Sequence, residues 1–354
     1  MKTSNNNLSS VNRKNIRFWF VSNWERFQTL LVIIIFIFLA STPVYIKSPY
    51  YMGIIILATL YAYVGITWNI IAGFTGQLLM AHIIFLGVGA FTTIVLYNKF
   101  QISPWIGMFA GGIICACLGF VVSLLTLRYG LKSDYFSLFT IALMVTIKTI
   151  FLKWKLVGGA VGMWIRLSDP SAKDMIFLDK APYLYIILTM LIIAYIIQYK
   201  IYNSKMGKYF VAIREDENAA SSLGVNTAKY KTLAVVIGTA LAGIGGGFYV
   251  MYVTFVSPTS IFELAINVEI CVASPVIGGL GSLAGPILGA VIYKPMAELV
   301  RGLFSATRSG SSLIIYGSFL VLAILFMPRG IAGIIRSWFI RNQAHWLKKY
   351  SGGN

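Results

Sequence analysis

Long apolar runs separated by short polar connections make up most of this chain. Most of the runs are long enough to cross a hydrocarbon core of about 30 Å as helices. Helix is the expected structure because lipid offers no hydrogen-bond partners to the backbone. The pattern therefore predicts about ten helical segments, namely Phe27–Ile46, Tyr51–Ala72, Leu78–Tyr97, Trp105–Leu127, Tyr135–Leu152, Tyr183–Tyr199, Leu233–Val256, Leu264–Leu280, Pro286–Phe304 and Ser311–Met327.

Two of these segments are interrupted by glycine and are not predicted to be plain spans. Leu78–Tyr97 follows a glycine-containing hinge, and Leu264–Leu280 leads into a second glycine-rich stretch. One interruption in each half is typical of an internal repeat whose broken helices line a path. Close helix packing is the alternative, because several glycines have GxxxG spacing. The candidate pathway residues here are Gly73, Gly76, Gln77, Gly278, Gly279 and Gly281.

Lys200–Lys231 is the one long polar segment, and it lies between two apolar runs. Three consecutive acids at 215–217 fall within it, in a chain with only 11 Asp and Glu residues. We predict a helix over Arg214–Leu223 that ends at Gly224 in the left-handed conformation. A second helix is predicted to begin at Thr227. Such a compact element is suited to docking on a motor protein that the chain itself lacks; a solvated loop without a partner is the alternative.

Composition supports a membrane location. The chain is 58% hydrophobic and 11% charged, whereas soluble domains carry about 25% charged residues. Its net charge of +18 comes from Lys and Arg that gather at the ends of apolar runs, as the positive-inside rule expects. Nucleic-acid binding is not predicted, because basic and aromatic residues do not share one polar face.

The distribution of Lys and Arg also sets the predicted orientation. With the N-terminus inside, the polar segment and the basic C-terminal tail lie inside as well. We predict a cytosolic N-terminal tail (1–26), a single transmembrane domain (27–328) and a cytosolic C-terminal tail (329–354). The domain includes an outside loop (153–182) and a cytosolic loop (200–232). The predicted fold is an all-α integral membrane protein, a polytopic bundle of about 8–10 transmembrane segments with glycine-interrupted segments and an internal inverted repeat.

The sequence contains no catalytic or nucleotide-binding constellation. Its only Gly-Lys pair, at 207–208, fails the P-loop pattern. His82 and Glu269 fall within predicted membrane segments, where ionisable groups are costly and commonly functional, so both join the candidate pathway residues. For His82 the alternative is a hydrogen-bonded packing group, and for Glu269 it is an ion pair with Lys294 or Arg301. We predict no enzyme activity, no cofactor and no metal site.

Four sequence blocks follow one another along the chain. They lie at the first glycine hinge, in the outside loop, in the polar segment and around the second glycine-rich stretch. Their residues are Gly73-Phe74-Thr75-Gly76-Gln77 with His82, then Val157–Gly162, then Ala212–Gly224, and then Ser257-Pro258, Glu269, Gly278–Pro286 and Pro328-Arg329-Gly330. In this order the blocks resemble those of permease subunits of branched-chain amino acid ABC transporters, of the LivM type.

The resemblance implies a division of labour among several partners. A periplasmic solute-binding protein delivers substrate, this chain and a second permease subunit form the pathway as a heterodimer, and two ABC ATPase subunits supply the energy. The implied activity is import of leucine, isoleucine, valine or a related small polar solute by alternating access across the lipid of a bacterial inner membrane. The third block is implied to couple to the ATPase through Arg214, Glu215, Asp216, Glu217, Ala219, Ala220 and Gly224.

The sequence departs from the family pattern near the presumed path. Val157 stands where the outer block has Thr, and Ala81 stands where the first block has Gly. The stretch at 273–275 replaces an aliphatic one. Because these departures bear on the substrate, a urea or amide importer permease is an alternative. A self-contained secondary carrier or channel is another, although the spans hold few of the acids that ion coupling uses.

Overall fold

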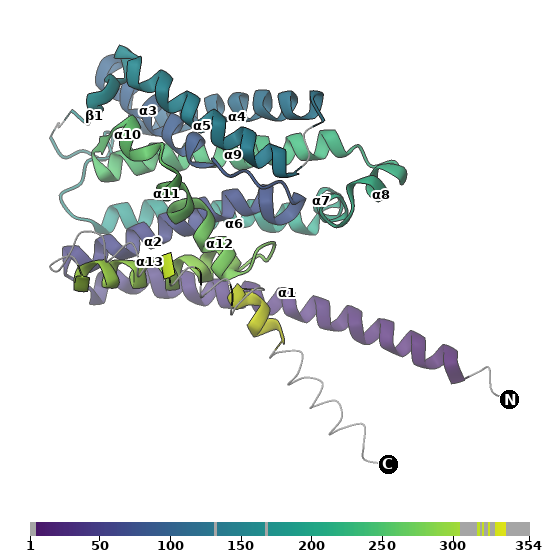
Figure 1. The fold of residues 1–354 in the computed structure, drawn as a ribbon. Helices are drawn as coiled ribbons and strands as arrows, with labels where there is room; N and C mark the ends of the chain where they lie inside the picture. The colour runs from purple at the N-terminus through teal and green to yellow at the C-terminus, as the bar shows by residue number, and fades with distance from the viewer. Residues whose placement is uncertain are drawn as a thin grey trace.

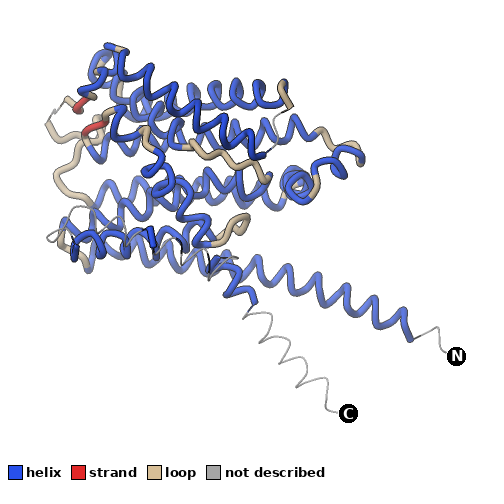
Figure 2. Tube along the Cα trace, viewed as in Figure 1, coloured by secondary structure: helices blue, strands red, loops and turns tan. Residues whose placement is uncertain are grey.

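The computed structural model describes residues 5–130, 133–166, 169–304 and 330–337, together with 317–318, 321 and 325. In this part of the chain helices dominate, and the named strands form one small two-stranded sheet (Figures 1 and 2). Seven of the described helices are long and apolar enough to cross a membrane. The predicted all-α polytopic fold is confirmed.

The long helices follow the predicted apolar runs with small shifts at their ends. The first begins well before Phe27, so the predicted N-terminal tail continues the first span as one helix. The predicted segment Ser311–Met327 and the basic tail after Ser337 lie largely or wholly outside the described residues. The long helices are α1 (Asn5–Tyr45), α2 (Pro49–Trp68), α3 (Ile83–Phe100), α4 (Pro104–Arg128), α5 (Ser133–Lys153), α6 (Ala181–Asn203), α9 (Thr227–Val253) and α13 (Gly285–Phe304).

The helices lie in two tiers in Figure 1. One tier packs α3, α4 and α9 against one another, and the other packs α6 and α13 against α2. Glycines allow close approach in the first tier: a Cβ added to Gly89 would lie 2.0 Å from the Gly243 carbonyl oxygen, and one added to Gly243 would lie 2.7 Å from the Gly111 carbonyl oxygen. The packing interpretation of the GxxxG glycines therefore holds for this tier.

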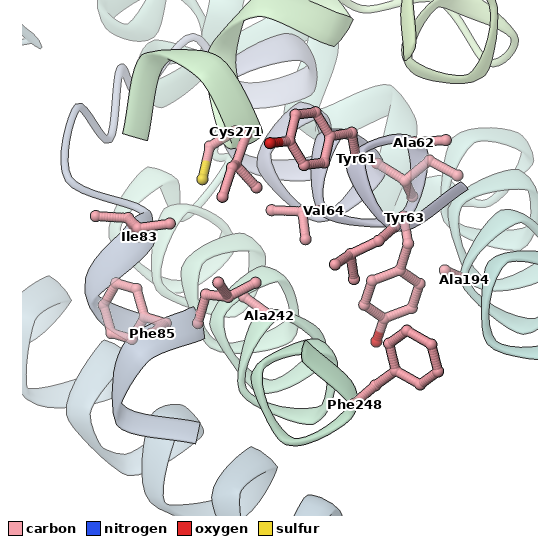
Figure 3. Packing of buried hydrophobic residues seen from close by; sticks show 14 of the residues in the cluster. Tyr61, Ala62, Tyr63, Val64, Ile83, Phe85, Ala194, Ala242, Phe248 and Cys271 are labelled. Carbon is pink, nitrogen blue, oxygen red and sulfur yellow. The ribbon is translucent and has the colours of Figure 1, made fainter. Parts of the chain in front are cut away.

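The core between the tiers is centred on α2, which is buried along almost its whole length. Tyr61 and Tyr63 leave this helix on different sides, Tyr61 toward the segment that carries Cys271 and Tyr63 toward Phe248 on α9 (Figure 3). The Tyr63 hydroxyl donates to the Leu241 carbonyl at 2.7 Å, so this buried polar group is satisfied. Helix α2 is thus the element on which both tiers depend.

Two breaks interrupt the bundle where the glycine pattern predicts them. Helix α2 continues into one turn of π-helix, η1 (Asn69–Gly73). The chain then leaves helical geometry before α3 begins at Ile83. The second interruption passes through short pieces before α13, which are α10 (Pro258–Ile261), α11 (Leu264–Asn267), η4 (Val268–Val272) and α12 (Ala273–Gly278). Residues 69–82 are called the first break below, and residues 267–284 the second break.

The polar segment folds as two short helices between α6 and α9, namely α7 (Lys205–Glu215) and α8 (Glu217–Ser222). Asp216 separates them, because its backbone is extended and its carboxylate accepts hydrogen bonds from two N–H groups of α8 at 2.9 and 3.0 Å. The predicted single helix Arg214–Leu223 is therefore wrong at its start. Gly224 is left-handed with φ +84° and α9 begins at Thr227, as predicted. Residues 205–224 are called the knob.

The opposite end of the bundle carries the connection between α5 and α6 (Figure 1). Two short turns, η2 (Lys155–Val157) and η3 (Gly159–Val161), lead into β1 (Met163–Trp164). This strand pairs antiparallel with β2 (Phe255–Val256), which follows α9. The loop 153–182 and the knob are therefore at opposite ends of the helices.

Candidate functional site

Two buried asparagines hold the two breaks together. Asn69, the first residue of η1, accepts a hydrogen bond from the Gly281 N–H at 2.8 Å. Its side-chain amide donates to the Ser282 carbonyl at 3.0 Å. Asn267, just before η4, accepts from the Ile83 N–H at 3.0 Å and donates to the Met80 carbonyl at 2.6 Å. Each break thus supplies partners for backbone groups at the other, and we call this arrangement the asparagine clamp.

The breaks also touch backbone to backbone. A Cβ on Gly73 would lie 2.8 Å from the Gly281 nitrogen, and Gly281 has φ +76°, so these positions require glycine. Where the second break meets α13, a Cβ on Gly278 would lie 1.7 Å from the Gly285 carbonyl oxygen. The candidate pathway glycines are therefore at a tightly packed junction. Nothing in this closed junction tests the predicted path itself, which stays a prediction.

Arg214 connects the knob to this junction. Its Nη1 donates to the Gly73 carbonyl at 2.8 Å, and its other donors reach Glu215 Oε1 at 2.8 and 3.3 Å. A Cβ on Gly281 would lie 2.5 Å from Arg214 Nη1, and one on Gly76 would lie 3.1 Å from its Cγ. Of the residues predicted to face an ATPase, Arg214 is thus the one whose side chain turns back onto both breaks.

The remaining predicted coupling residues lie on the surface of the knob, with one exception. Glu215, Asp216, Glu217, Ala219 and Gly224 are exposed, whereas Ala220 is buried. Glu217 forms an ion pair with Lys231 at the start of α9. Leu223, which the sequence analysis did not single out, is 86% exposed at the end of α8.

Two cavities flank Arg214. The larger, of about 860 Å³, is lined by residues of α1, α6, α7, the second break and the segment 332–337. The smaller, of about 230 Å³, is lined by Gln77 and neighbouring residues of the first break, together with Phe136, the acids of the knob and Lys231. Arg214 and Glu215 line both cavities, so these two residues form part of the wall between them.

His82 is fully buried at the end of the first break. Its Nε2 lies 2.8 Å from the Thr67 hydroxyl, while Nδ1 has no hydrogen-bond partner among the described residues. This is the arrangement that the packing interpretation predicts. A role for His82 in the path stays a prediction.

Glu269 belongs to a buried charged cluster in the middle of the helices. Lys294 on α13 lies 3.4 Å from Glu269 and 2.5 Å from Glu298. The Tyr61 hydroxyl donates to Glu269 at 3.2 Å and accepts from Lys294 at 3.2 Å. The predicted pairing of Glu269 with Lys294 is confirmed, and the side chain of Arg301, the other predicted partner, is outside the described part. The cluster joins α2, η4 and α13.

Residues 50–327 match the family described as branched-chain amino acid transport system, permease component. The chain belongs to this family. A curated relative, the high-affinity branched-chain amino acid transport permease LivM of Escherichia coli K12, is 25% identical over 338 residues, which cover 87% of this chain and 76% of LivM. LivH of the same organism is 31% identical over 146 residues, 41% of this chain and 44% of LivH. No solved structure was found to match.

For this permease, sequence reasoning found the breaks and the knob but missed the residues that join them. Asn69 and Asn267 had a detectable signal, since each is a strongly polar side chain inside an apolar run. Such a group is costly in lipid unless it is hydrogen-bonded within the protein. Gln28 on α1 carries the same signal: it is buried, and it accepts hydrogen bonds from the Leu283 and Ala284 N–H groups at 3.1 and 3.3 Å.

Replacing Asn69 with Ala is expected to destabilise the permease. The change removes the side-chain partner of the Gly281 N–H and leaves the Ser282 carbonyl with the longer hydrogen bond from Gln198 at 3.4 Å. An unsatisfied buried group costs about 1–3 kcal/mol. The melting temperature of the purified protein in one detergent measures the effect. Asn218→Ala is the matched control, because Asn218 is exposed and its side chain has no hydrogen bond in the described structure. Equal melting temperatures for the two variants would contradict the clamp.

Lys294→Met is expected to destabilise the permease by about 3–5 kcal/mol, because it leaves the buried Glu269 carboxylate and the partly buried Glu298 carboxylate without their ammonium partner. Lys148→Met on α5 is the control, since Lys148 is only half-buried and forms no ion pair among the described residues. Thermal unfolding of both variants provides the comparison. Adding Glu269→Gln to Lys294→Met should restore part of the loss; a Lys294→Met protein as stable as the control would show that the cluster is not a stabilising anchor.

Proposed function

We propose that this chain is the permease subunit of an ABC importer for branched-chain amino acids, driven by partner ATPases and catalysing no bond change itself. Membership of the permease family supports the general activity. The observation that carries the coupling mechanism is the position of Arg214, which belongs to the knob and hydrogen-bonds the first break while packing on the second. A movement of the knob therefore acts on both breaks at once.

Force enters through the exposed surface of α8 in this proposal. The Glu217–Lys231 ion pair joins α8 to α9, and the single residue Asp216 joins α8 to α7. Helices α6 and α9 flank the knob with short connections, so little slack separates the docking surface from the spans. Closure of two ATPases on ATP would push α8, turn α7 and move the Arg214 side chain against the junction.

The other partners follow from the same proposal. A second permease subunit completes the pathway, as the names of the LivM and LivH relatives suggest for their own systems. A solute-binding protein delivers substrate at the end that carries β1 and β2. We place the knob and both termini in the cytosol of a bacterium with the spans in its inner membrane, because the basic residues concentrate at that end.

Leu223→Asp is expected to prevent the ATPase from co-purifying with the permease and to reduce ATP-driven transport at least tenfold. The reason is that an exposed apolar side chain at the tip of a docking element acts as an anchor once a partner covers it. Leu178→Asp is the matched control for co-purification, because Leu178 is 89% exposed and belongs to the connection between α5 and α6, at the end of the helices opposite the knob. Co-purification quantified by gel, with melting temperature as a folding check, gives the result.

The outcome that would contradict ATPase docking is a well-folded Leu223→Asp protein that still co-purifies with its ATPase as the control does. Loss of co-purification in both variants would also contradict it, because the loss would then not depend on the knob.

The substrate assignment is tested by uptake into proteoliposomes that hold the complete complex. We expect ATP-dependent uptake of radiolabelled leucine and valine and no uptake of urea. ATP-dependent uptake of urea alone would favour the amide importer, and uptake without ATP would favour a secondary carrier. Failure to move any amino acid would reject the substrate while leaving the architecture intact.

A further inference from the structure

The larger cavity beside Arg214 is lined by both apolar and charged side chains, a combination that amino acid transport does not explain. Its volume of about 860 Å³ exceeds what a single small solute fills. Apolar side chains from three elements form much of its wall, among them Val211 on α7 and Val276, Leu280 and Leu283 in the second break. Apolar surface next to charged groups is the lining that an amphipathic ligand needs.

The cavity also offers a guanidinium group that has no partner among the residues the structure describes. Arg336 lines it, is exposed, and forms no ion pair or hydrogen bond among the described residues. The acid in the lining, Glu215, is already bound by Arg214 at 2.8 Å. Because a guanidinium binds phosphate oxygens through two parallel hydrogen bonds, Arg336 is suited to a phosphate-bearing anion.

The level of the cavity in the membrane follows from α1. The apolar run of this helix begins at Phe27, directly after Arg26 in the sequence. Trp24 and Gln28, which lie on either side of that boundary, both line the cavity. Tryptophan and arginine concentrate at the interface between hydrocarbon and water. The cavity therefore crosses this interface, with room for an apolar part on one side and an anionic part on the other.

We propose that this cavity binds an anionic phospholipid of the leaflet at the knob end, with the phosphate on Arg336 and an acyl chain along Val276, Leu280 and Leu283. Basic pockets between transmembrane helices at the cytosolic side hold such head groups in general. The bound lipid contacts the second break and the Arg214 wall. Its occupancy therefore stabilises the closed junction and makes permease activity depend on the anionic lipid content of the membrane.

The test is native mass spectrometry of the purified full-length permease complex in detergent, with dioleoylphosphatidylglycerol or dioleoylphosphatidylcholine added at equal concentration. We expect preferential retention of phosphatidylglycerol. Arg336→Gln should weaken this retention about fivefold, the effect of one cation on an anionic head group. Arg128→Gln should leave it unchanged, because Arg128 is an exposed arginine at the end of α4 that does not line the cavity.

Val211→Trp provides a second variant that fills the cavity without changing its charge, and it should also reduce phosphatidylglycerol binding. Melting temperatures confirm that each variant is folded. Equal retention of the two lipids, or equal binding by Arg336→Gln and Arg128→Gln, would overturn the proposal. Displacement of the lipid by millimolar inorganic phosphate would overturn it too, in favour of a free-anion site. Because the readout is lipid binding, its failure leaves the importer proposal standing, and the transport assays do not decide it.

Discussion

The structure depends on a constraint that lipid imposes on interrupted helices: backbone groups freed at a break need partners from the protein. The asparagine clamp meets this need reciprocally, with Asn69 serving the second break and Asn267 serving the start of α3. Because each asparagine lies in one break and bonds to residues at the other, neither break can move far without disturbing the other. The two interruptions, almost 200 residues apart in the sequence, behave as one structural unit.

Arg214 adds a mechanical connection to that unit. The guanidinium bonds the Gly73 carbonyl and packs on Gly281, so the end of α7 rests on the contact point of the two breaks. A side chain at position 73 or 281 would clash at this contact point and prevent the Arg214 guanidinium from packing there. The need for glycine at the junction and for arginine on the knob thus has the same cause: a polar loop and two helix breaks share a small volume.

A second anchor lies deeper in the bundle, where Lys294 bridges Glu269 and Glu298 beside Tyr61. Burying these charges is costly, and the cost is offset only while ammonium, carboxylates and hydroxyl stay together. The cluster holds η4 against α2 and α13, while the asparagine clamp holds the ends of the same segment. Movement of the second break therefore has to carry α2 and α13 with it or separate buried charges. We therefore expect the second break, α2 and α13 to move together in the permease.

Length and hydropathy were enough to predict the seven described helices that can cross a membrane, because a bilayer accepts little other than helices of about 20 apolar residues. Glycine positions predicted the breaks, and Gly224 and Thr227 predicted where the knob ends and α9 begins. The helix boundary at Asp216 was missed because the same acids suit either a first helical turn or a cap. Only the tertiary structure decided that Asn69 serves Gly281, that the Arg214 guanidinium reaches the Gly73 carbonyl, and that Lys294 pairs with Glu269. Those contacts join residues about 25 to 210 positions apart, and local pattern carries no information about which distant backbone group a buried polar side chain will reach.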